Sequence, residues 1–365
     1  MKTYADFGYN YHEYSGNKFY ITLGIHAGVA TRYFLVDEKE VFESNLAFCN
    51  VLANYINEDC QKCFKFHVDR TVTTVSYVGK TETMGDDIAL LLKKVFKLEL
   101  NIKKFESVKH KTIENFKKVY KNGDFRGWYK SYEIADLNKG FLLKTLIDDL
   151  QKITWEKFSD CYERIVTPFN SCTYINGNIR DLSREEIANI NNILAVDKPK
   201  VILGGRVIDP YVRGDAHLLE ISRECCNLDI VCFSFEESIG MLDRLIYLMI
   251  ESDKIPYQMK TVHLDEFDAS LIVNEDGLMK LQNFYRKLSS SEQFEKSRNI
   301  LLCKYKNWLD NNPERFGNMY VELELNNIST ADYLDVLSNL TYEVYQKIGV
   351  QIKPIISEAQ IVMRR

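Results

Sequence analysis

The sequence predicts an α+β protein built from two tandem homologous domains, each a mainly antiparallel sheet with helices on one face. Three observations support this class. The chain has 365 residues, of which 45% are apolar, and this is enough to form the cores of two domains. Segments with the residue patterns of strands and helices follow one another in both halves. Two of the helical segments recur in the second half at nearly the same spacing.

The first half begins with two segments typical of strands, residues 18–27 and 31–36, rich in β-branched and aromatic residues. A helix is predicted at 40–56, because apolar residues recur there at spacings of three and four. The long Val- and Thr-rich segment 64–78 is predicted as one strand. Helices are then predicted at residues 86–96, 105–120, 138–150 and 154–164, followed by a strand at 171–176.

A polar, charged segment separates the two halves. We predict a linker at residues 181–198, and hence one domain at 1–180 and another at 199–365. In the second domain, strands are predicted at 200–203, 228–235, 259–273 and 350–355, and helices at 238–251, 276–288, 293–309 and 330–347.

The spacing of matching segments indicates a duplication. Helix 86–96 matches helix 276–287 at an offset of 190, and the segment that starts at Phe105 matches the one at Phe294 at an offset of 189. Nearly equal offsets at two helices favour two copies of one domain. The alternative is that any two α+β domains contain helices this similar.

Composition narrows the classes of function. Lys and Arg number 47 and Asp and Glu 52, a net charge of −5, which disfavours a nucleic-acid partner because phosphate contacts need a basic surface. No apolar run reaches the ~18 residues of a membrane span. The nine cysteines are odd in number and irregularly spaced, as expected for reduced thiols. We therefore expect a soluble, cytoplasmic protein.

Several segments, taken in order, resemble a known family across nearly the whole chain. They are ITLGIHAGVATRYF, EVFESNLAFCNVLANYI, FHVDRTVTTVSYVGK, FESVKHKTIENFKK and ITWEKFSDCYERIVTPFNSCTYINGNI, the last carrying Pro168, Asn170, Gly177 and Asn178. Together with the duplication, they resemble the insulinase/pitrilysin-type zinc peptidases, above all the half-size members that act as paired chains.

The resemblance implies that this chain is the non-catalytic member of such a pair. The family carries H-x-x-E-H on its first long helix, where two His bind zinc and the Glu is the general base. Here the matching positions are Ala47, Asn50 and Val51, and the distal Glu position falls near Glu114 or Asn115. We therefore expect no metal or cofactor in this chain, and zinc in an insulinase-type partner subunit.

The same resemblance suggests where the peptide substrate is bound. The family's second domain supplies a Tyr and an Arg to the chamber; Tyr257 matches the Tyr, and Lys254 is the nearest cation to the Arg. Tyr257 is alternatively an ordinary strand-edge aromatic. We also expect a peptide to pair with an exposed strand edge near residues 64–74, with Arg70, Thr71 and Thr73 in contact. The alternative there is an interior strand.

Other functions stay open at the level of sequence. Bacterial half-size pairs of this kind process ribosomally made peptides, so the resemblance implies a leader peptide as substrate. A different possibility is a self-associating peptide-binding or chaperone module on an inactive peptidase fold. A more remote one is an enzyme of another type that uses Cys60 or Cys63 of a lone C-x-x-C, although two unreactive loop thiols are the simpler explanation of this motif.

Overall fold

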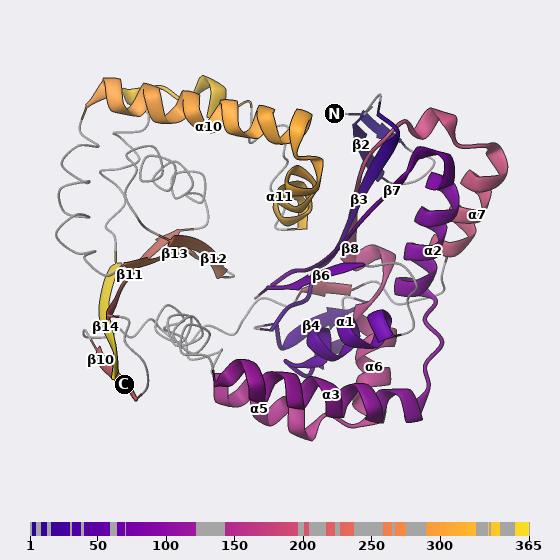
Figure 1. Cartoon of the computed structure of the whole chain (residues 1–365), viewed down its shortest axis with the longest axis horizontal. Coiled ribbons are helices and arrows are strands. Elements are labelled where there is room, and N and C mark those ends of the chain that lie inside the picture. Colours follow the sequence, from indigo (N-terminus) through magenta and orange to yellow (C-terminus); the bar gives the residue numbers. More distant parts are fainter. Residues whose placement is uncertain are drawn as a thin grey trace. The chain divides into compact units, whose positions relative to one another are not determined.

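The structure is a computed structural model, and the chain in it forms two compact units, each described here by itself (Figure 1). One unit consists of Met1–Asn115, Thr145–Gly205 and Asn307–Ala331, and the other of Phe116–Lys144, Arg206–Lys306 and Asp332–Arg365. The structure describes residues 2–4, 9–12, 16–29, 31–37, 40–58, 64–69, 71–121, 143–195, 201–203, 217–222, 227–236, 258–264, 267–274, 290–325, 335, 337–343 and 355–364.

The first unit contains a six-stranded sheet in which all neighbours are antiparallel except β2 and β8. Its strands, in order across the sheet, are β1 (Lys2–Tyr4), β2 (Tyr9–His12), β8 (Ser171–Asn176), β3 (Lys18–Ile25), β7 (Thr73–Lys80) and β6 (Lys65–Val68). The predicted strands 18–27 and 171–176 are therefore confirmed, and β6 lies at one edge.

Helices cover the face of this sheet to which β3 turns Phe19, Ile21, Leu23 and Ile25, all at most 2% exposed. Phe158 lies at the centre of an aromatic cluster, with its ring 5.0–5.6 Å from three others on two more helices. The helices are α1 (Phe48–Glu58), α2 (Met84–Phe96), α3 (Ile102–Tyr120), α5 (Leu143–Lys152), α6 (Trp155–Ile165) and α7 (Arg184–Leu194), with 3₁₀ turns at Thr81–Thr83, Pro168–Asn170 and Ile179–Asp181.

The opposite face of the sheet also carries a helix, α11 (Pro313–Leu325), which the sequence analysis did not predict. Two glycines allow it to approach closely: a Cβ on Gly24 of β3 would lie 2.0 Å from Val321 Cγ1, and a Cβ on Gly317 would lie 2.7 Å from Thr22 Oγ1. Because a side chain at either position would collide, these glycines set the distance between α11 and the sheet.

The predicted helix 40–56 is wrong at its start. Glu40–Glu43 is a strand, β5, and α1 begins only at Phe48. In β5, Phe42 is 6% exposed and Val41 is 70% exposed, which is the two-residue alternation of a strand. It forms a three-stranded antiparallel sheet with β4 (Tyr33–Val36) and β9 (Val201–Leu203).

Two long predicted strands are in fact hairpins. The segment 64–78 divides into β6 and β7, which pair antiparallel, and the segment 259–273 divides into β12 (Gln258–Leu264) and β13 (Phe267–Asn274). A single strand of 15 residues would be much longer than the usual 3–10, and polar residues inside each segment are a turn signal in the sequence.

The second unit contains a five-stranded sheet in the order β10 (His217–Ser222), β14 (Ile355–Arg364), β11 (Asn227–Glu236), β13 and β12. Only β10 and β14 are parallel. This is the order and direction of β2, β8, β3, β7 and β6 in the first unit. The equivalence confirms the α+β class with two mainly antiparallel sheets, and β14 begins where the predicted strand 350–355 ends.

Other predictions differ in outcome along the chain. The predicted helix 293–309 is confirmed as α10 (Ser291–Asn311), while the predicted helices 238–251 and 276–288 lie outside the described residues. The predicted linker contains α7, which begins with a capping box between Ser183 and Glu186. The domain boundaries themselves stay predictions.

No helix in the described part of the chain is long and apolar enough to cross a membrane.

Candidate functional site

The positions that match the zinc motif lie in the core of the first unit. Ala47, in the turn before α1, and Val51, in its first turn, are both 0% exposed. Asn50 is half-buried, and its Nδ2 has no hydrogen-bond partner among the residues that the structure describes. The hydrocarbon side chains of Ala47 and Val51 offer no lone pair to a metal ion.

Helix α3, next to α1, does not supply a set of side chains that could replace the missing zinc ligands. Asn54 Nδ2 of α1 donates to Thr112 Oγ1 of α3 at 3.0 Å, so the two helices meet through an amide and a hydroxyl. Glu114 is half-buried and Asn115 is exposed. In the described residues, no group of three His, Cys, Asp or Glu side chains is placed to hold a metal ion. A catalytic zinc site needs three protein ligands, and the residues at these positions do not fit one.

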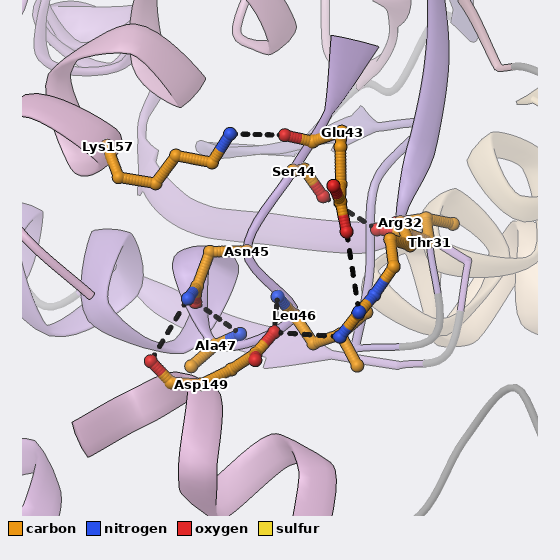
Figure 2. A network of polar contacts seen from close by, with 9 residues as sticks. All are labelled: Thr31, Arg32, Glu43, Ser44, Asn45, Leu46, Ala47, Asp149 and Lys157. Carbon is orange, nitrogen blue, oxygen red and sulfur yellow. Dashed lines mark hydrogen bonds and ion pairs between the residues drawn. The ribbon is translucent and has the colours of Figure 1, made fainter. Parts of the chain in front are cut away.

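A polar network fixes the chain where it enters α1 (Figure 2). Asp149 Oδ2 of α5 accepts hydrogen bonds from the Leu46 backbone N–H at 3.0 Å and from Arg32 Nη2 at 3.1 Å. Asn45 Nδ2 donates to the Asp149 carbonyl oxygen at 3.0 Å, and Asn45 Oδ1 accepts from the Ala47 backbone N–H at 2.9 Å. These bonds satisfy backbone N–H groups just before the helix and thereby set where it begins.

The network continues into the small sheet. Arg32 Nη1 lies 3.4 Å from Glu43 Oε1, and Lys157 Nζ donates to the Glu43 carbonyl oxygen (Figure 2). Ser44 Oγ donates to the Thr31 carbonyl oxygen at 2.9 Å. Both partners of each of these contacts belong to the first unit. We therefore interpret the network as structural.

Three buried thiols, those of Cys49, Cys161 and Cys172, are poorly suited to nucleophilic chemistry. Burial raises the pKa of Cys49 to about 12, of Cys161 to about 11 and of Cys172 to about 12. A thiol with so high a pKa is protonated at neutral pH, and the thiolate is the reactive form. Cys60 and Cys63 lie outside the described residues.

The predicted peptide-binding edge corresponds to β6. This strand pairs with β7 on one side, and no other described strand pairs with it. Its side chains alternate: Lys65 and His67 are exposed, and Phe66 and Val68 are half-buried. Such an edge offers backbone donors and acceptors to an extended chain.

Of the residues predicted to contact the peptide, the structure describes Thr71 and Thr73, and neither belongs to β6. Thr73 belongs to interior strand β7, is 2% exposed and donates its hydroxyl to the Ala27 carbonyl oxygen at 2.7 Å. Thr71 lies in the bend between the two strands and is half-buried. Arg70, Lys254 and Tyr257 lie outside the described residues.

One ion pair and one close His–Asp contact at β6 were not anticipated. Lys65 Nζ lies 2.9 Å and 3.0 Å from the two carboxylate oxygens of Glu314 in α11, and His67 Nε2 lies 3.7 Å from Asp69 Oδ2. The Lys65–Glu314 pair connects residues 249 positions apart, which no local pattern reveals. What the sequence does offer is a signal for the helix that carries Glu314. Helix α11 has Pro313 at its start and has Phe316 and Tyr320 one turn apart.

Comparisons with known proteins identify the fold. No family model matches the sequence, and no curated protein does. An M16-like peptidase from Alicyclobacillus acidocaldarius has a similar structure, with a TM-score of 0.72 at 15% sequence identity over 95% of this chain and 93% of that one. An inactive domain of peptidase M16 from Pseudomonas fluorescens gives a TM-score of 0.67 at 12% identity over 100% and 98%.

A longer protein matches in part. The periplasmic protease PqqL from Escherichia coli gives a TM-score of 0.64 at 14% identity over 98% of this chain and 47% of PqqL, so this chain spans about half of that protease. At such identities the likeness concerns the fold, and it agrees with the insulinase-type fold that the sequence resemblance implies. The chain therefore has the α+β fold of the M16-like peptidases.

Proposed function

We propose that this chain is the non-catalytic subunit of a heterodimeric insulinase-type metallopeptidase. One observation carries the proposal: Ala47 and Val51, to which the sequence resemblance assigns the two His of H-x-x-E-H, are buried hydrocarbon side chains, and the same resemblance assigns the Glu to Asn50. Zinc would then be held by the partner chain, and this chain would have no cofactor. The inactive M16 domain from Pseudomonas fluorescens gives a precedent for the fold without activity.

In this proposal the chain binds the peptide substrate. An extended peptide pairs with the free edge of β6, because backbone pairing gives affinity with little demand on sequence. The substrate we propose is an unfolded peptide such as the leader of a ribosomally made peptide. Free thiols at Cys49, Cys161, Cys172 and Cys303 support a reducing compartment, the cytoplasm.

Tyr257 and Lys254 complete the proposal as residues that support the transition state in the partner's site. A phenol donor at the scissile carbonyl oxygen contributes roughly 3–4 kcal/mol, judged from the removal of one oxyanion donor in other enzymes. Tyr257→Phe in the reconstituted pair should therefore lower kcat by about a hundredfold or more. Exposed Tyr33, changed to Phe, is the matched control. A change within a few-fold would mean that Tyr257 has no part in the chemistry.

Assembly is the direct test of the subunit role. The chain is co-expressed with a half-size chain from the same genome that carries H-x-x-E-H, and the mixture is analysed by size-exclusion chromatography with light scattering. A one-to-one complex that cleaves an unfolded peptide, where neither chain cleaves alone, supports the proposal. A chain that forms only homo-oligomers and binds peptide without cleavage would favour the self-associating carrier instead.

A further inference from the structure

Two polar side chains of β8 are buried on the face of the sheet that carries α11. Tyr174 and Asn176 are both 0% exposed. They lie two residues apart on one strand, so their side chains leave it on the same side. The Tyr174 ring packs on α11, with its centroid 4.8 Å from that of Tyr320 and 5.5 Å from that of Phe316. Both polar side chains therefore belong to the interior of the first unit.

The sheet fixes the direction in which both side chains point. β8 is an interior strand, paired with β2 on one side and with β3 on the other. A register shift by one residue would turn Tyr174 and Asn176 to the other face, but it would also turn the buried Thr173 and Ile175 away from the helices. The phenol and the amide are thus held in the interior and cannot turn towards solvent.

The polar atoms of these two side chains are unpaired. Tyr174 Oη, Asn176 Nδ2 and Asn176 Oδ1 are buried and make no hydrogen bond to any residue that the structure describes. The Tyr162 hydroxyl, equally buried, accepts from the Leu98 backbone N–H at 2.8 Å and donates to the Val95 carbonyl oxygen at 3.0 Å. One unpaired buried polar group lowers the folding equilibrium constant by about five- to hundredfold. Three such atoms in one place therefore need a partner.

The phenol and the amide lie close to each other. Burial raises the pKa of the Tyr174 phenol, and the interaction with the Asn176 side chain lowers it in part. The two groups thus interact although no direct hydrogen bond joins them. Polar atoms that approach each other in this way are commonly bridged by water. The three atoms carry no net charge and include both donors and an acceptor, which suits water better than an ion.

We propose that Tyr174 and Asn176 bind one buried water molecule as a constituent of the first unit. The water accepts hydrogen bonds from the Asn176 Nδ2–H and the Tyr174 hydroxyl and donates one of its protons to Asn176 Oδ1. All three unpaired atoms are then satisfied, and three hydrogen bonds are the usual number for a buried water. This site is separate from the proposed peptide-binding function and stands or falls independently of it.

A crystal structure of the intact chain at about 1.5 Å resolution shows the site directly. We expect one ordered water whose oxygen lies about 2.7–3.2 Å from each of the three atoms. A site in which these atoms have neither water nor another partner would overturn the inference. A direct hydrogen bond from a side chain of β2, the strand that pairs with β8, would overturn it equally.

Urea denaturation of single variants tests the water in solution. Tyr174→Phe keeps the ring and removes only the hydroxyl, so it should lower the folding equilibrium constant about fivefold if the hydroxyl is bonded to water. A variant as stable as wild type, or more stable, would mean that the hydroxyl is unpaired and would overturn the inference. Tyr162→Phe is the matched control, because it removes a buried hydroxyl with two protein partners and should be destabilising in either case.

A double-mutant cycle tests whether one water joins the two side chains. Asn176→Val removes both amide atoms and, with them, two of the three hydrogen bonds of the water. In that background Tyr174→Phe should lower the folding equilibrium constant less than about twofold, because the hydroxyl has already lost its partner. The same fivefold loss in both backgrounds would show that Tyr174 is satisfied independently of Asn176, and the shared water would be wrong.

Discussion

Arg32 Nη2 and Asp149 Oδ2 lie 3.1 Å apart, and the same carboxylate oxygen accepts the Leu46 backbone N–H just before α1. One side chain of α5 thus holds both Arg32, just before β4, and the start of α1, the helix to which the sequence resemblance assigns the zinc-motif positions. The helix keeps its place in the fold through these contacts and needs no metal ligand to do so.

Removing this carboxylate should destabilise the first unit. Asp149→Ala leaves the Leu46 N–H and the Arg32 guanidinium without their acceptor in a partly buried position, at a cost of about 2–3 kcal/mol of unfolding free energy. Urea denaturation measures it. Glu40→Ala is the control, because it removes an exposed pair with Arg164 and should cost about 0.5 kcal/mol. Equal effects of the two variants would show that Asp149 does not organise the start of α1.

Gly24→Ala should loosen the packing of α11. The new Cβ would fall 2.0 Å from Val321 Cγ1, so the helix has to move or the side chain has to shift. We expect a loss of about 1–3 kcal/mol, in the range of overpacked cores. The double variant Gly24→Ala, Val321→Ala should recover part of it. Hydrogen exchange in residues 313–325 reports the effect locally, and unchanged protection there would contradict the close contact.

His26 should make stability depend on pH. Burial lowers the pKa of its imidazole from 6.5 to about 4, so the unfolded chain binds the proton more readily than the folded one. The stabilisation is fully present above pH 6.5 and is lost as the pH falls to about 4. It amounts to at most about 3 kcal/mol, at 1.4 kcal/mol per pKa unit.

The variant His26→Gln isolates this contribution, because the carboxylates titrate alike in both proteins. Denaturation by urea at pH 7 and pH 4.5 should show wild type losing about 2 kcal/mol more than the variant on acidification. A difference between the two proteins that stays the same at both pH values would mean that His26 is not buried as a neutral group.

The thiols should differ sharply in reactivity. Cys303 is exposed, whereas Cys49, Cys161 and Cys172 have pKa values that burial raises to about 11–12. With iodoacetamide at pH 8, peptide mapping should find Cys303 alkylated in the folded chain and these three protected until urea unfolds it. Rapid alkylation of Cys49 or Cys161 in the folded chain would contradict their protection and would make a nucleophilic role of that thiol possible again.

Local signals predicted much of the fold. A helix was predicted at 154–164, and the Thr154 hydroxyl accepts the Lys157 backbone N–H at 3.2 Å at the start of α6. The first turn of α2 carries Asp86 and Asp87 and its last turn Lys93 and Lys94, as the helix dipole favours. Such capping and charge patterns lie within a few residues of one another, and the sequence displays them directly.

The errors arose where tertiary pairing decides the structure. The segment EVFE has two apolar residues that also fit a helix, and only its pairing with β4 makes it β5. Likewise, the strand edge that stays free depends on which strands become neighbours, so Thr73 was grouped with residues of an edge although β7 is interior. Asp149 could not have been linked to Arg32, 117 residues away, by any local pattern.

Metal content and activity of the chain purified alone test the central claim most directly. The protein is expressed without its partner in zinc-supplemented medium, dialysed against a weak chelator, analysed for metals and assayed with an unfolded fluorogenic peptide. Because Ala47 and Val51 cannot coordinate zinc, we predict no bound zinc and no cleavage. About one zinc per chain that survives chelation, with cleavage that a strong chelator abolishes, would show a zinc site elsewhere in the chain and contradict the account.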